Sequence, residues 1–572
     1  MMRSNNTMRI GIIGGGPAAL FMYKRLVESG GDKLHITIFE KNNRLGPGMP
    51  YSTDGACPEH ITNVSDNEIP LIKEHIKDWV EKAPKEILSP YQITEDLFNE
   101  YKVLPRLLFG EYLAAQFEKI HHAAKEAGIK TSFLFNTIVT DIEDDSEGEK
   151  VTVYTGADRS YTFDSVIICT GHTWPKKLEG KVPGWYDSPY PPSKLAKKIN
   201  YPVAIKGASL TAIDAVRTLA KNNGSFEKKE DSTLMFKLDP ESKGFKIRMH
   251  SLNGLLPAIR FHLEDSQLSP GSMLSEEEVQ QILKDNQGFI SLDYIFDRNF
   301  KQPLLKEHPE FYNEIKEMQM EEFVAHMMNL REKLDAFILF KAEYAEAEKS
   351  IKRKQSVYWK EMLAVLSYAM NYPAKHLSAE DMIRLKKVLM PLISIVIAFV
   401  PQSSCRELMA LYDAGVLEVV PVDEHSSVMP MEEGALYKYR DGNGKQIEEK
   451  YKLFIDAVGQ APVLYKDFPF DTLKKRGTVS ESSVRFLSTE EGSKELNNGN
   501  ELVTSLDNIN YYLKVPGISI NDHFQAVDEH GVYNRRIYVM AVPLIAGLNP
   551  DYSGLDFCEA ASKRIVKAMF NE

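Results

Sequence analysis

The sequence predicts an α/β protein with two Rossmann-like dinucleotide-binding domains, each carrying a β-meander, and a mostly helical insertion in the second domain. Three observations support this fold class. A glycine-rich turn joins a strand to a helix within residues 8–41, the same pattern returns within residues 201–251, and each copy is followed by a meander and a glycine-ended strand. One supersecondary unit therefore occurs twice in the 572 residues.

The first glycine-rich turn has the spacing of a dinucleotide-binding fingerprint. The apolar strand Met8–Ile13 leads directly into Gly14-Gly15-Gly16-Pro17-Ala18-Ala19, and an amphipathic helix follows. Gly14 permits the tight turn, Gly16 lets the backbone approach a pyrophosphate, and the small Ala19 lets the helix pack on the strand. The N–H groups of the first helical turn, which begins with Pro17 and Ala18, face the phosphates.

The next strand, residues 34–39, ends on Glu40 and Lys41. Glu40 lies near the spacing of about 20 residues at which an acid binds a ribose hydroxyl pair. We therefore place Glu40 and Lys41 in the predicted cofactor site. A glycine-rich turn in an α/β protein that binds no nucleotide is the alternative.

A loop rich in glycine and proline, residues 44–51, follows Glu40. It is interpreted either as a cover over a bound ligand or as a surface excursion. Residues 60–64 form a short strand-like piece next to it. Pro105 and Arg106 then begin a long helix that extends to about Gly128. Arg106 either meets phosphate oxygens through its guanidinium or stays in solvent.

Segments further along the chain complete both copies. Residues 138–142 and 151–154 with a returning strand predict a meander, which leads to a buried strand ending in Thr170-Gly171-His172. The second copy is predicted from strand 201–206, a turn and helix at 207–216, strand 245–251, a meander from 435 and a glycine-ended strand at 452–459. A final strand at 536–543 and a helix at 555–570 have the right elements to return to the first domain.

The segment between residues 274 and 392 is predicted to be mostly helical. Its methionine-rich stripes are typical of flexible core packing, with a cofactor-binding role as the alternative. Such an insertion can build a substrate pocket or the contact of a homodimer. No motif in it indicates a particular chemistry.

Composition excludes several classes of function. A net charge of −12 and a pI near 5.7 argue against nucleic acid as a partner. The four cysteines are scattered without metal-ligand spacing, which predicts reduced thiols and no metal site. The N-terminus lacks a signal-peptide pattern, and the most apolar run, residues 388–400, is broken by Pro391 and shorter than the ~20 residues of a membrane span. We therefore expect a cytoplasmic protein without membrane contact.

Taken together, these motifs resemble the bacterial FAD-NAD(P)-binding family of two-dinucleotide-binding-domain flavoproteins, which is related to flavin-dependent, N-hydroxylating monooxygenases. The resemblance rests on Gly14-x-Gly16-x-x-Ala19, Gly48 with Tyr51, Asn63-Val64, Pro105-Arg106 with Gly110–Leu113, Thr170-Gly171-His172, the Gly207–Asp214 turn and Asn253–Pro257. These motifs cover the first and second domains and hardly touch the insertion.

The resemblance implies FAD in the first domain and NADPH or NADH in the second. The FAD pyrophosphate would lie at residues 14–19, its adenosine ribose on Glu40, and its isoalloxazine near residues 48–51 and Asn63, with residues 541–555 closing over the ring. The implied cofactor-binding residues are Gly14, Gly16, Pro17, Ala18, Ala19, Glu40, Lys41, Gly48, Tyr51, Asn63, Arg106, Thr170, Gly171, Gly207, Ser209, Leu210 and Thr211.

The two copies of the unit and the helical stretch between them predict the order of the domains along the chain. An FAD-binding domain begins at 8–200, an NAD(P)-binding-like domain at 201–273 is interrupted by the helical insertion at 274–392, and it resumes at 393–465. Residues 466–572 return to the FAD-binding domain.

The second domain departs from the family pattern at two positions. Ser209 stands where a glycine lets the backbone approach the pyrophosphate. Leu252 follows Ser251 where an arginine would hold a 2′-phosphate, and no acid is present there for NAD. These departures predict that the nicotinamide nucleotide binds weakly or not at all.

The leading functional hypothesis is an FAD-dependent oxidoreductase that is reduced by NAD(P)H and uses molecular oxygen to hydroxylate a small molecule. One alternative is an FAD oxidase or dehydrogenase with a degenerate nicotinamide domain. Another is a non-catalytic flavin-binding protein whose insertion docks a partner. No catalytic residue is assigned: His172 and His250 are interpreted either as acid–base groups or as structural histidines.

Overall fold

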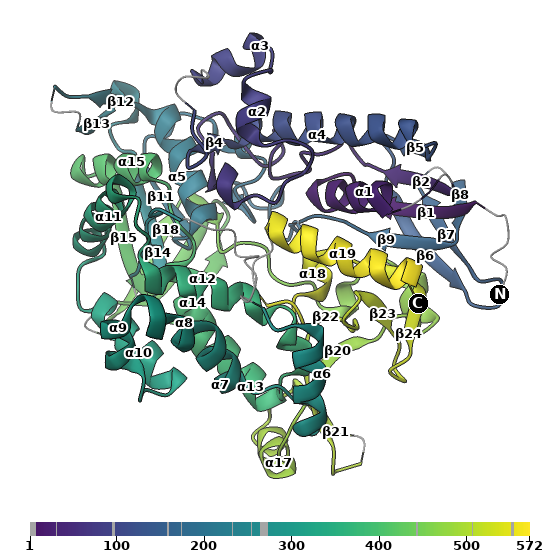
Figure 1. Ribbon diagram of the computed structural model, residues 1–572. Helices are drawn as coiled ribbons and strands as arrows, with labels where there is room; N and C mark the ends of the chain where they lie inside the picture. Colours follow the sequence, from purple (N-terminus) through teal and green to yellow (C-terminus); the bar gives the residue numbers. More distant parts are fainter. Residues whose placement is uncertain are drawn as a thin grey trace.

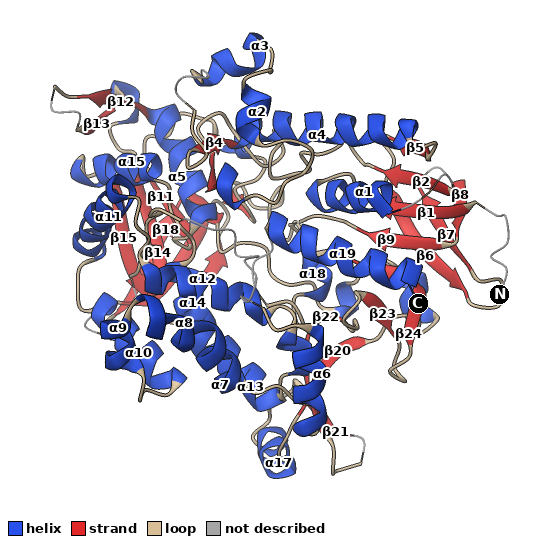
Figure 2. Cartoon of the chain, viewed as in Figure 1, coloured by secondary structure: helices blue, strands red, loops and turns tan. Residues whose placement is uncertain are grey.

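The computed structural model describes residues 7–571, except residues 30, 32, 94–97, 157–158, 173, 231–232, 253, 264–272, 442–443, 506 and 551–553. Within this part the predicted α/β class is confirmed, with two parallel sheets covered by helices (Figures 1 and 2). Gly30 at the predicted end of the first helix, parts of both meander turns and Asn253 lie outside the described residues. The domain boundaries stay predictions.

The first sheet has six strands in the order β23-β24-β9-β1-β2-β5. Its strands are β1 (Met8–Ile13), β2 (Leu34–Phe39), β5 (Lys130–Leu134), β9 (Ser165–Ile168), β23 (Gln525–Val527) and β24 (Tyr533–Val539). All neighbours are parallel except β23 and β24. The pairing of β24 with β9 shows that the C-terminal segment joins the N-terminal sheet, as its predicted strand and helix suggested.

Helices α1 (Pro17–Ser29), α4 (Arg106–Glu126) and α19 (Leu555–Asn571) accompany this sheet, and α1 lies beside α19 (Figure 1). The apolar face of α1 is fully buried, and Lys24 of α1 pairs with Glu559 of α19 at 3.2 Å. The buried β-branched residues of β1 and β2 form the centre of the core, as expected for a sheet covered on both faces.

The second sheet has five parallel strands in the order β10-β19-β11-β14-β15. Its strands are β10 (Trp185–Tyr186), β11 (Pro202–Lys206), β14 (Lys246–Leu252), β15 (Leu417–Val422) and β19 (Leu453–Asp456). Helices α5 (Leu210–Asn223) and α15 (Gln402–Asp413) pack with these strands in one buried cluster. The predicted second strand–turn–helix–strand unit is therefore present.

Both predicted meanders form three-stranded antiparallel sheets. The first consists of β6 (Val139–Asp145), β7 (Lys150–Thr155) and β8 (Arg159–Phe163), and the second of β16 (Ser427–Pro430), β17 (Ala435–Arg440) and β18 (Gln446–Tyr451). Two further antiparallel pieces were not predicted. They are the hairpin of β12 (Gly224–Lys228) and β13 (Leu234–Leu238) and the sheet of β20 (Glu481–Arg485), β21 (Val503–Ser505) and β22 (Tyr511–Ile518).

The insertion is helical, as predicted, and leaves and rejoins the second sheet at adjacent positions. Its helices are α6 (Glu276–Asp285), α7 (Leu292–Phe296), α8 (Gln302–Glu307), α9 (Pro309–Ile315), α10 (Met320–Glu332), α11 (Ala336–Arg353), α12 (Tyr358–Met370), α13 (Ala379–Arg384) and α14 (Met390–Val396). A bridge between Ile259 and Val400 closes its base. Two segments are π-helical, Asp297–Lys301 and Leu385–Leu389.

The remaining elements are short. They are β3 (Ile61–Ser65), β4 (Val103–Pro105), α2 (Ile76–Val80), α3 (Lys85–Leu88), α16 (Asp471–Lys475), α17 (Thr489–Asn497) and α18 (Val542–Ile545). In the described part of the chain, no helix is both long and apolar enough to cross a membrane.

Candidate functional site

The two glycine-rich turns have the same backbone geometry. Gly14 and Gly207 have φ angles of +103° and +106°, which L side chains rarely adopt. A Cβ on Gly14 would lie 2.7 Å from the carbonyl oxygen of Cys169, the residue after β9, and one on Gly207 would lie 2.9 Å from that of Ala457, the residue after β19. Each turn therefore packs against the neighbouring parallel strand in a way that only glycine permits.

The first turn lies against the glycine- and proline-rich loop. The N–H of Gly46 donates to the carbonyl of Gly15 at 2.7 Å. A Cβ on Gly16 would lie 3.3 Å from the Cα of Gly48, so two bare backbones face each other. Helix α1 begins at Pro17 and has no acidic residue in its first turn, which leaves its positive N-terminal end to an anion. These residues fit a dinucleotide pyrophosphate.

Glu40 is held at the end of β2 by the turn itself. Its carboxylate accepts hydrogen bonds from the N–H of Gly15 at 2.7 Å and of Asn42 at 2.8 Å, and its side chain is buried. A carboxylate has about four lone-pair positions, so two remain for ribose hydroxyls. Lys41, by contrast, points into solvent.

A cavity of about 1290 Å³ is lined by the loop that packs against the first turn, by the second glycine turn and by the insertion. The predicted site residues among its lining residues are Tyr51, Asn63, Arg106, Gly207, Ser209, Leu210 and Thr211. The predicted residues outside its lining are Gly14, Gly16, Pro17, Ala18, Ala19, Glu40, Lys41, Gly48, Thr170 and Gly171. Apart from Lys41, the residues outside the lining lie in the segments that follow β1, β2 and β9, next to the first turn.

Ser209 leaves its hydroxyl available at the second turn. It is the N-cap residue of α5, is exposed, and makes no side-chain capping bond. Helix α5 has no acidic residue in its first turn either. At the end of β14, Leu252 is 57% exposed and lines the cavity beside Ser251, whose hydroxyl donates to the carbonyl of Leu255 at 2.6 Å. Near the second turn, the exposed apolar side chain of Leu252 therefore stands where an arginine would hold a 2′-phosphate.

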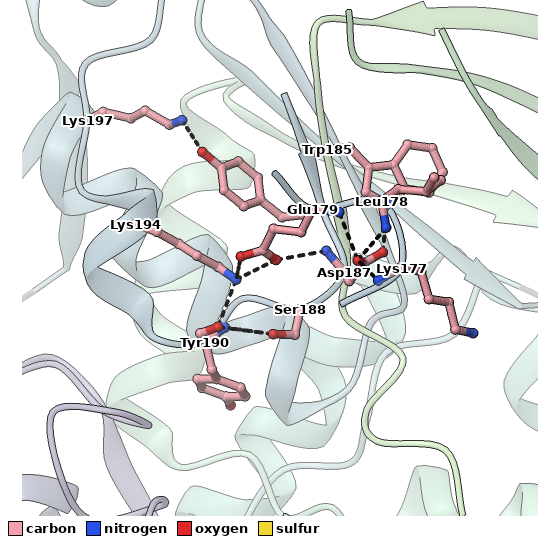
Figure 3. Close-up of polar contacts among 10 residues, drawn as sticks. Lys177, Leu178, Glu179, Trp185, Asp187, Ser188, Tyr190, Lys194 and Lys197 are labelled. Atoms are coloured by element: carbon pink, nitrogen blue, oxygen red, sulfur yellow. Dashed lines mark hydrogen bonds and ion pairs between the residues drawn. The ribbon is translucent and has the colours of Figure 1, made fainter. Parts of the chain in front are cut away.

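The segment of chain between β9 and β11 is stabilised by a polar network (Figure 3). The Asp187 carboxylate accepts from the N–H groups of Lys177, Leu178 and Glu179 and from the indole N–H of Trp185. These bonds hold the pKa of Asp187 below its usual value although burial opposes them. The Lys194 ammonium donates to both Glu179 oxygens at 2.9 Å and to the carbonyl of Tyr190 at 2.7 Å.

The Tyr190 ring extends away from this network in Figure 3 and lines the cavity. Its hydroxyl donates to the Asp214 carboxylate at 2.8 Å, and its ring lies 5.1 Å from that of Trp174. The network therefore positions an aromatic wall of the cavity.

Arg106 lines the cavity, and its guanidinium is paired within the protein. Its Nη1 donates to Asp214 of α5 at 2.5 Å and its Nε to the carbonyl of Ile61 at 3.1 Å. Burial raises the pKa of the Asp214 carboxyl, but Arg106, His60 and the Tyr190 hydroxyl together bring it below its usual value. The ion pair joins the start of α4 to α5. No local sequence pattern predicts it, because 108 positions separate the partners.

The two histidines considered as acid–base groups have different surroundings. His172 lines the cavity, its Nδ1 lies 2.8 Å from the amide oxygen of Gln460, and burial lowers its pKa. His250 is buried and stacks on Tyr437 with ring centres 3.9 Å apart. Burial lowers the pKa of His250 to about 4. Since His250 is outside the cavity lining, its packing is structural.

A second ion pair, between Arg260 and Glu68, was also not predicted from the sequence. Arg260 is buried and its guanidinium contacts Glu68 and donates to the Ser65 hydroxyl at 2.7 Å and to the carbonyl of Asn63. Among the described residues, no group of three His, Cys, Asp or Glu side chains is arranged to hold a metal ion.

Comparisons with known families agree with this geometry. Residues 11–173 match the FAD-NAD(P)-binding family, and residues 275–397 match the YdhS-like middle domain. The predicted resemblance and its cofactors, FAD and a nicotinamide nucleotide, are thereby confirmed at the level of the family.

Several relatives are similar over most of the chain. The uncharacterized protein YdhS of Escherichia coli (strain K12) is 28% identical over 472 residues, which cover 82% of this chain and 86% of YdhS. Ornithine N-hydroxylase of Kutzneria sp. 744 has 12% identity, coverage of 99% of both chains and a TM-score of 0.48. L-lysine 6-monooxygenase of Pseudomonas syringae has 11% identity, coverage of 98% of this chain and 99% of its own, and a TM-score of 0.46.

Proposed function

We propose that the protein is an FAD-dependent oxidoreductase, reduced by NADPH or NADH, that uses molecular oxygen to oxygenate a small molecule. The observation that carries this proposal is the shared cavity. Its lining includes Tyr51 and Asn63 from the FAD-NAD(P)-binding domain, the turn Gly207–Thr211 that begins α5, and side chains of the insertion. A flavin ring, a nicotinamide ring and a substrate can therefore meet in one space.

The residues of the first turn would hold FAD. Gly14 and Gly16 would let the backbone approach the pyrophosphate, the start of α1 would receive its charge, and the remaining lone pairs of Glu40 would accept from the ribose. When bound, FAD supplies hydride and oxygen chemistry that amino-acid side chains lack. Tyr51 and Asn63 would orient the ring at the cavity wall.

The insertion would serve to exclude water and select the substrate. Helices α12 and α14 cover the cavity, and their lining residues are mostly apolar. His172, whose pKa burial lowers, stays neutral near pH 7 and can accept or pass on a proton at the cavity wall.

The first test is the absorbance spectrum of the purified protein, followed by anaerobic titration with NADPH and with NADH. We expect a yellow protein whose flavin absorbance is bleached by at least one nucleotide, and oxygen consumption after air is admitted. A protein that contains no flavin would contradict the proposal.

A second candidate function follows from the end of β14. The exposed Leu252 supplies no charge to a 2′-phosphate and no acceptor to a ribose. A flavin that neither nucleotide reduces, but an organic substrate does, would favour an oxidase or dehydrogenase that takes electrons directly from that substrate.

A further inference from the structure

The insertion side of the cavity combines apolar helices with two π-helical segments. The apolar lining includes Met328, Met362, Val365, Met390 and Ile393. The π-helical segment at 297–301 adds Arg298 and Asn299, and the one at 385–389 adds Lys386. Such π-helical turns are rare in proteins, and those that occur often lie at functional sites. Both π-helical segments therefore place polar side chains at the mostly apolar insertion side of the cavity.

Lys386 differs from the other basic groups of the cavity in its partners. Arg106 pairs with Asp214 at 2.5 Å, and Arg298 lies 3.7 Å from Glu278. Within the described part of the chain, Lys386 has no carboxylate at ion-pair distance and no hydrogen-bond partner. It is the lining cation for which this part of the protein supplies no counter-charge.

The surroundings of Lys386 are those of a side chain that projects into a cavity. It is accessible to solvent, yet burial among the surrounding atoms lowers its pKa and no acidic group raises it again. The next residue, Lys387, is exposed as well but is not among the lining residues. Lys386 is thus an exposed ammonium at an apolar part of the cavity wall without a counter-charge, and it can pair with an anionic ligand.

We propose that the insertion side of this cavity binds a small organic anion, whose apolar body lies against Met328, Met362 and Met390 and whose single carboxylate or sulfonate pairs with Lys386. Methionine side chains adapt to varied apolar shapes. Glu361 also lines the cavity and disfavours a second acidic group on the ligand. The inference rests on the proposed function in that this anion would be the substrate, while binding itself requires no turnover.

The test is isothermal titration calorimetry with the FAD-containing protein. It measures the binding affinity for octanoate and for its neutral counterpart octanamide. We expect the wild type to bind octanoate at least ten-fold more tightly than octanamide, because an ammonium–carboxylate bond forms in an apolar site. Lys386→Met should weaken octanoate binding about ten-fold and leave octanamide binding within two-fold. Lys386→Arg should retain the preference, and Lys387→Met is the matched control that should bind octanoate like the wild type.

Two results would overturn the inference. One is equal affinity of the wild type for octanoate and octanamide. The other is unchanged octanoate binding in Lys386→Met together with weaker NADPH binding in an anaerobic titration, since Lys386 would then contact the nucleotide. Selective octanoate binding in a protein whose flavin neither nucleotide reduces would support the anion site and contradict the proposed NAD(P)H-dependent reaction, so the two failures are distinguishable.

Discussion

Gly16 is a position where even the small side chain of alanine is expected to weaken FAD binding. Its backbone conformation is open to alanine, but the added Cβ would lie 3.3 Å from the Cα of Gly48. Gly16→Ala is therefore expected to fold and to lose FAD affinity about ten-fold or more, because the loop must shift where the pyrophosphate would bind. The ratio of flavin to protein absorbance after dialysis measures the loss.

Gly31→Ala is the matched control, since a Cβ there has no neighbour within 4 Å. Gly14→Ala should instead reduce the yield of folded protein, because a Cβ at a φ of +103° would meet a carbonyl oxygen at 2.7 Å. Equal FAD content in the Gly16 and Gly31 variants would contradict the proposed pyrophosphate site.

His250 is expected to make the protein less stable as the pH falls. Burial lowers its folded pKa to about 4, against 6.5 when unfolded. Between these values the unfolded chain binds a proton that the folded chain does not, so this group alone lowers the free energy of unfolding by about 2 kcal/mol from pH 7 to pH 5. His250→Phe, which keeps a ring against Tyr437, should remove this part of the pH dependence in urea denaturation.

His425→Phe provides the control for that measurement because His425 is exposed. Its pH dependence should follow that of the wild type. If the His250 and His425 variants lose stability equally between pH 7 and pH 5, the histidine stacked on Tyr437 does not carry the proposed pH effect.

At the scale of elements, we expect the end of β14 to determine which nicotinamide nucleotide the protein prefers. Leu252 is exposed at the cavity, so it can be replaced without disturbing the core. Leu252→Arg is expected to raise the preference for NADPH over NADH about ten-fold, because a guanidinium forms a charge-assisted bidentate pair with a 2′-phosphate. Rates of anaerobic flavin reduction by the two nucleotides measure this ratio.

Leu252→Gln tests whether charge is the cause, since it adds hydrogen-bonding groups at the same place without the positive charge. It should leave the NADPH to NADH ratio within two-fold of the wild type. A ratio unchanged in Leu252→Arg would mean that the nucleotide does not approach the end of β14.

Local sequence patterns predicted the elements whose spacing is repeated, and missed those that depend on distant packing. The turn at Gly14, the start of α4 and both meanders follow from glycine positions and hydrophobic periodicity. The strand β22 contains Pro516, and its neighbours β20 and β21 are short and polar, so no period-2 pattern identified this sheet.

The candidate site shows the same division between local and distant information. The spacing of the fingerprint placed Gly16 and Glu40 at the first turn, and the second turn was found by its likeness to the first. Lys386 lies in a π-helical segment, which has no sequence signature of its own. The pairing of Arg106 with Asp214 depends on how α4 packs near α5. Neither hydrophobic periodicity nor motif spacing predicts that arrangement.

At the scale of the whole molecule, two buried ion pairs join the two sheet regions at the cavity. Arg106 of α4 pairs with Asp214 of α5, and Arg260, close to the base of the insertion, pairs with Glu68 after β3. Because Asn63 and Arg106 line the cavity as well, its shape depends on these contacts. The relative position of the two regions is thus determined by charges that face each other across their boundary.

The pair of Arg106 with Asp214 makes this dependence measurable. Arg106→Met leaves a buried carboxylate whose remaining side-chain donor, among the described residues, is the Tyr190 hydroxyl, and is expected to lower the free energy of unfolding by about 3–5 kcal/mol. The double variant Arg106→Met with Asp214→Leu removes both charges and should recover most of that loss. Urea midpoints of the single and double variants give the coupling between the two positions.

Arg44→Met is the matched control, because Arg44, in the loop after β2, forms an exposed pair with Glu111 of α4 that is worth about 0.2–1 kcal/mol. If Arg106 only stabilised the fold, the double variant would also recover the rate of flavin reduction. We expect stability to return without the full rate, since a methionine–leucine contact replaces the directional bond that orients the two regions. Full recovery of both would contradict a role of the ion pair in positioning the nucleotide turn against the flavin site.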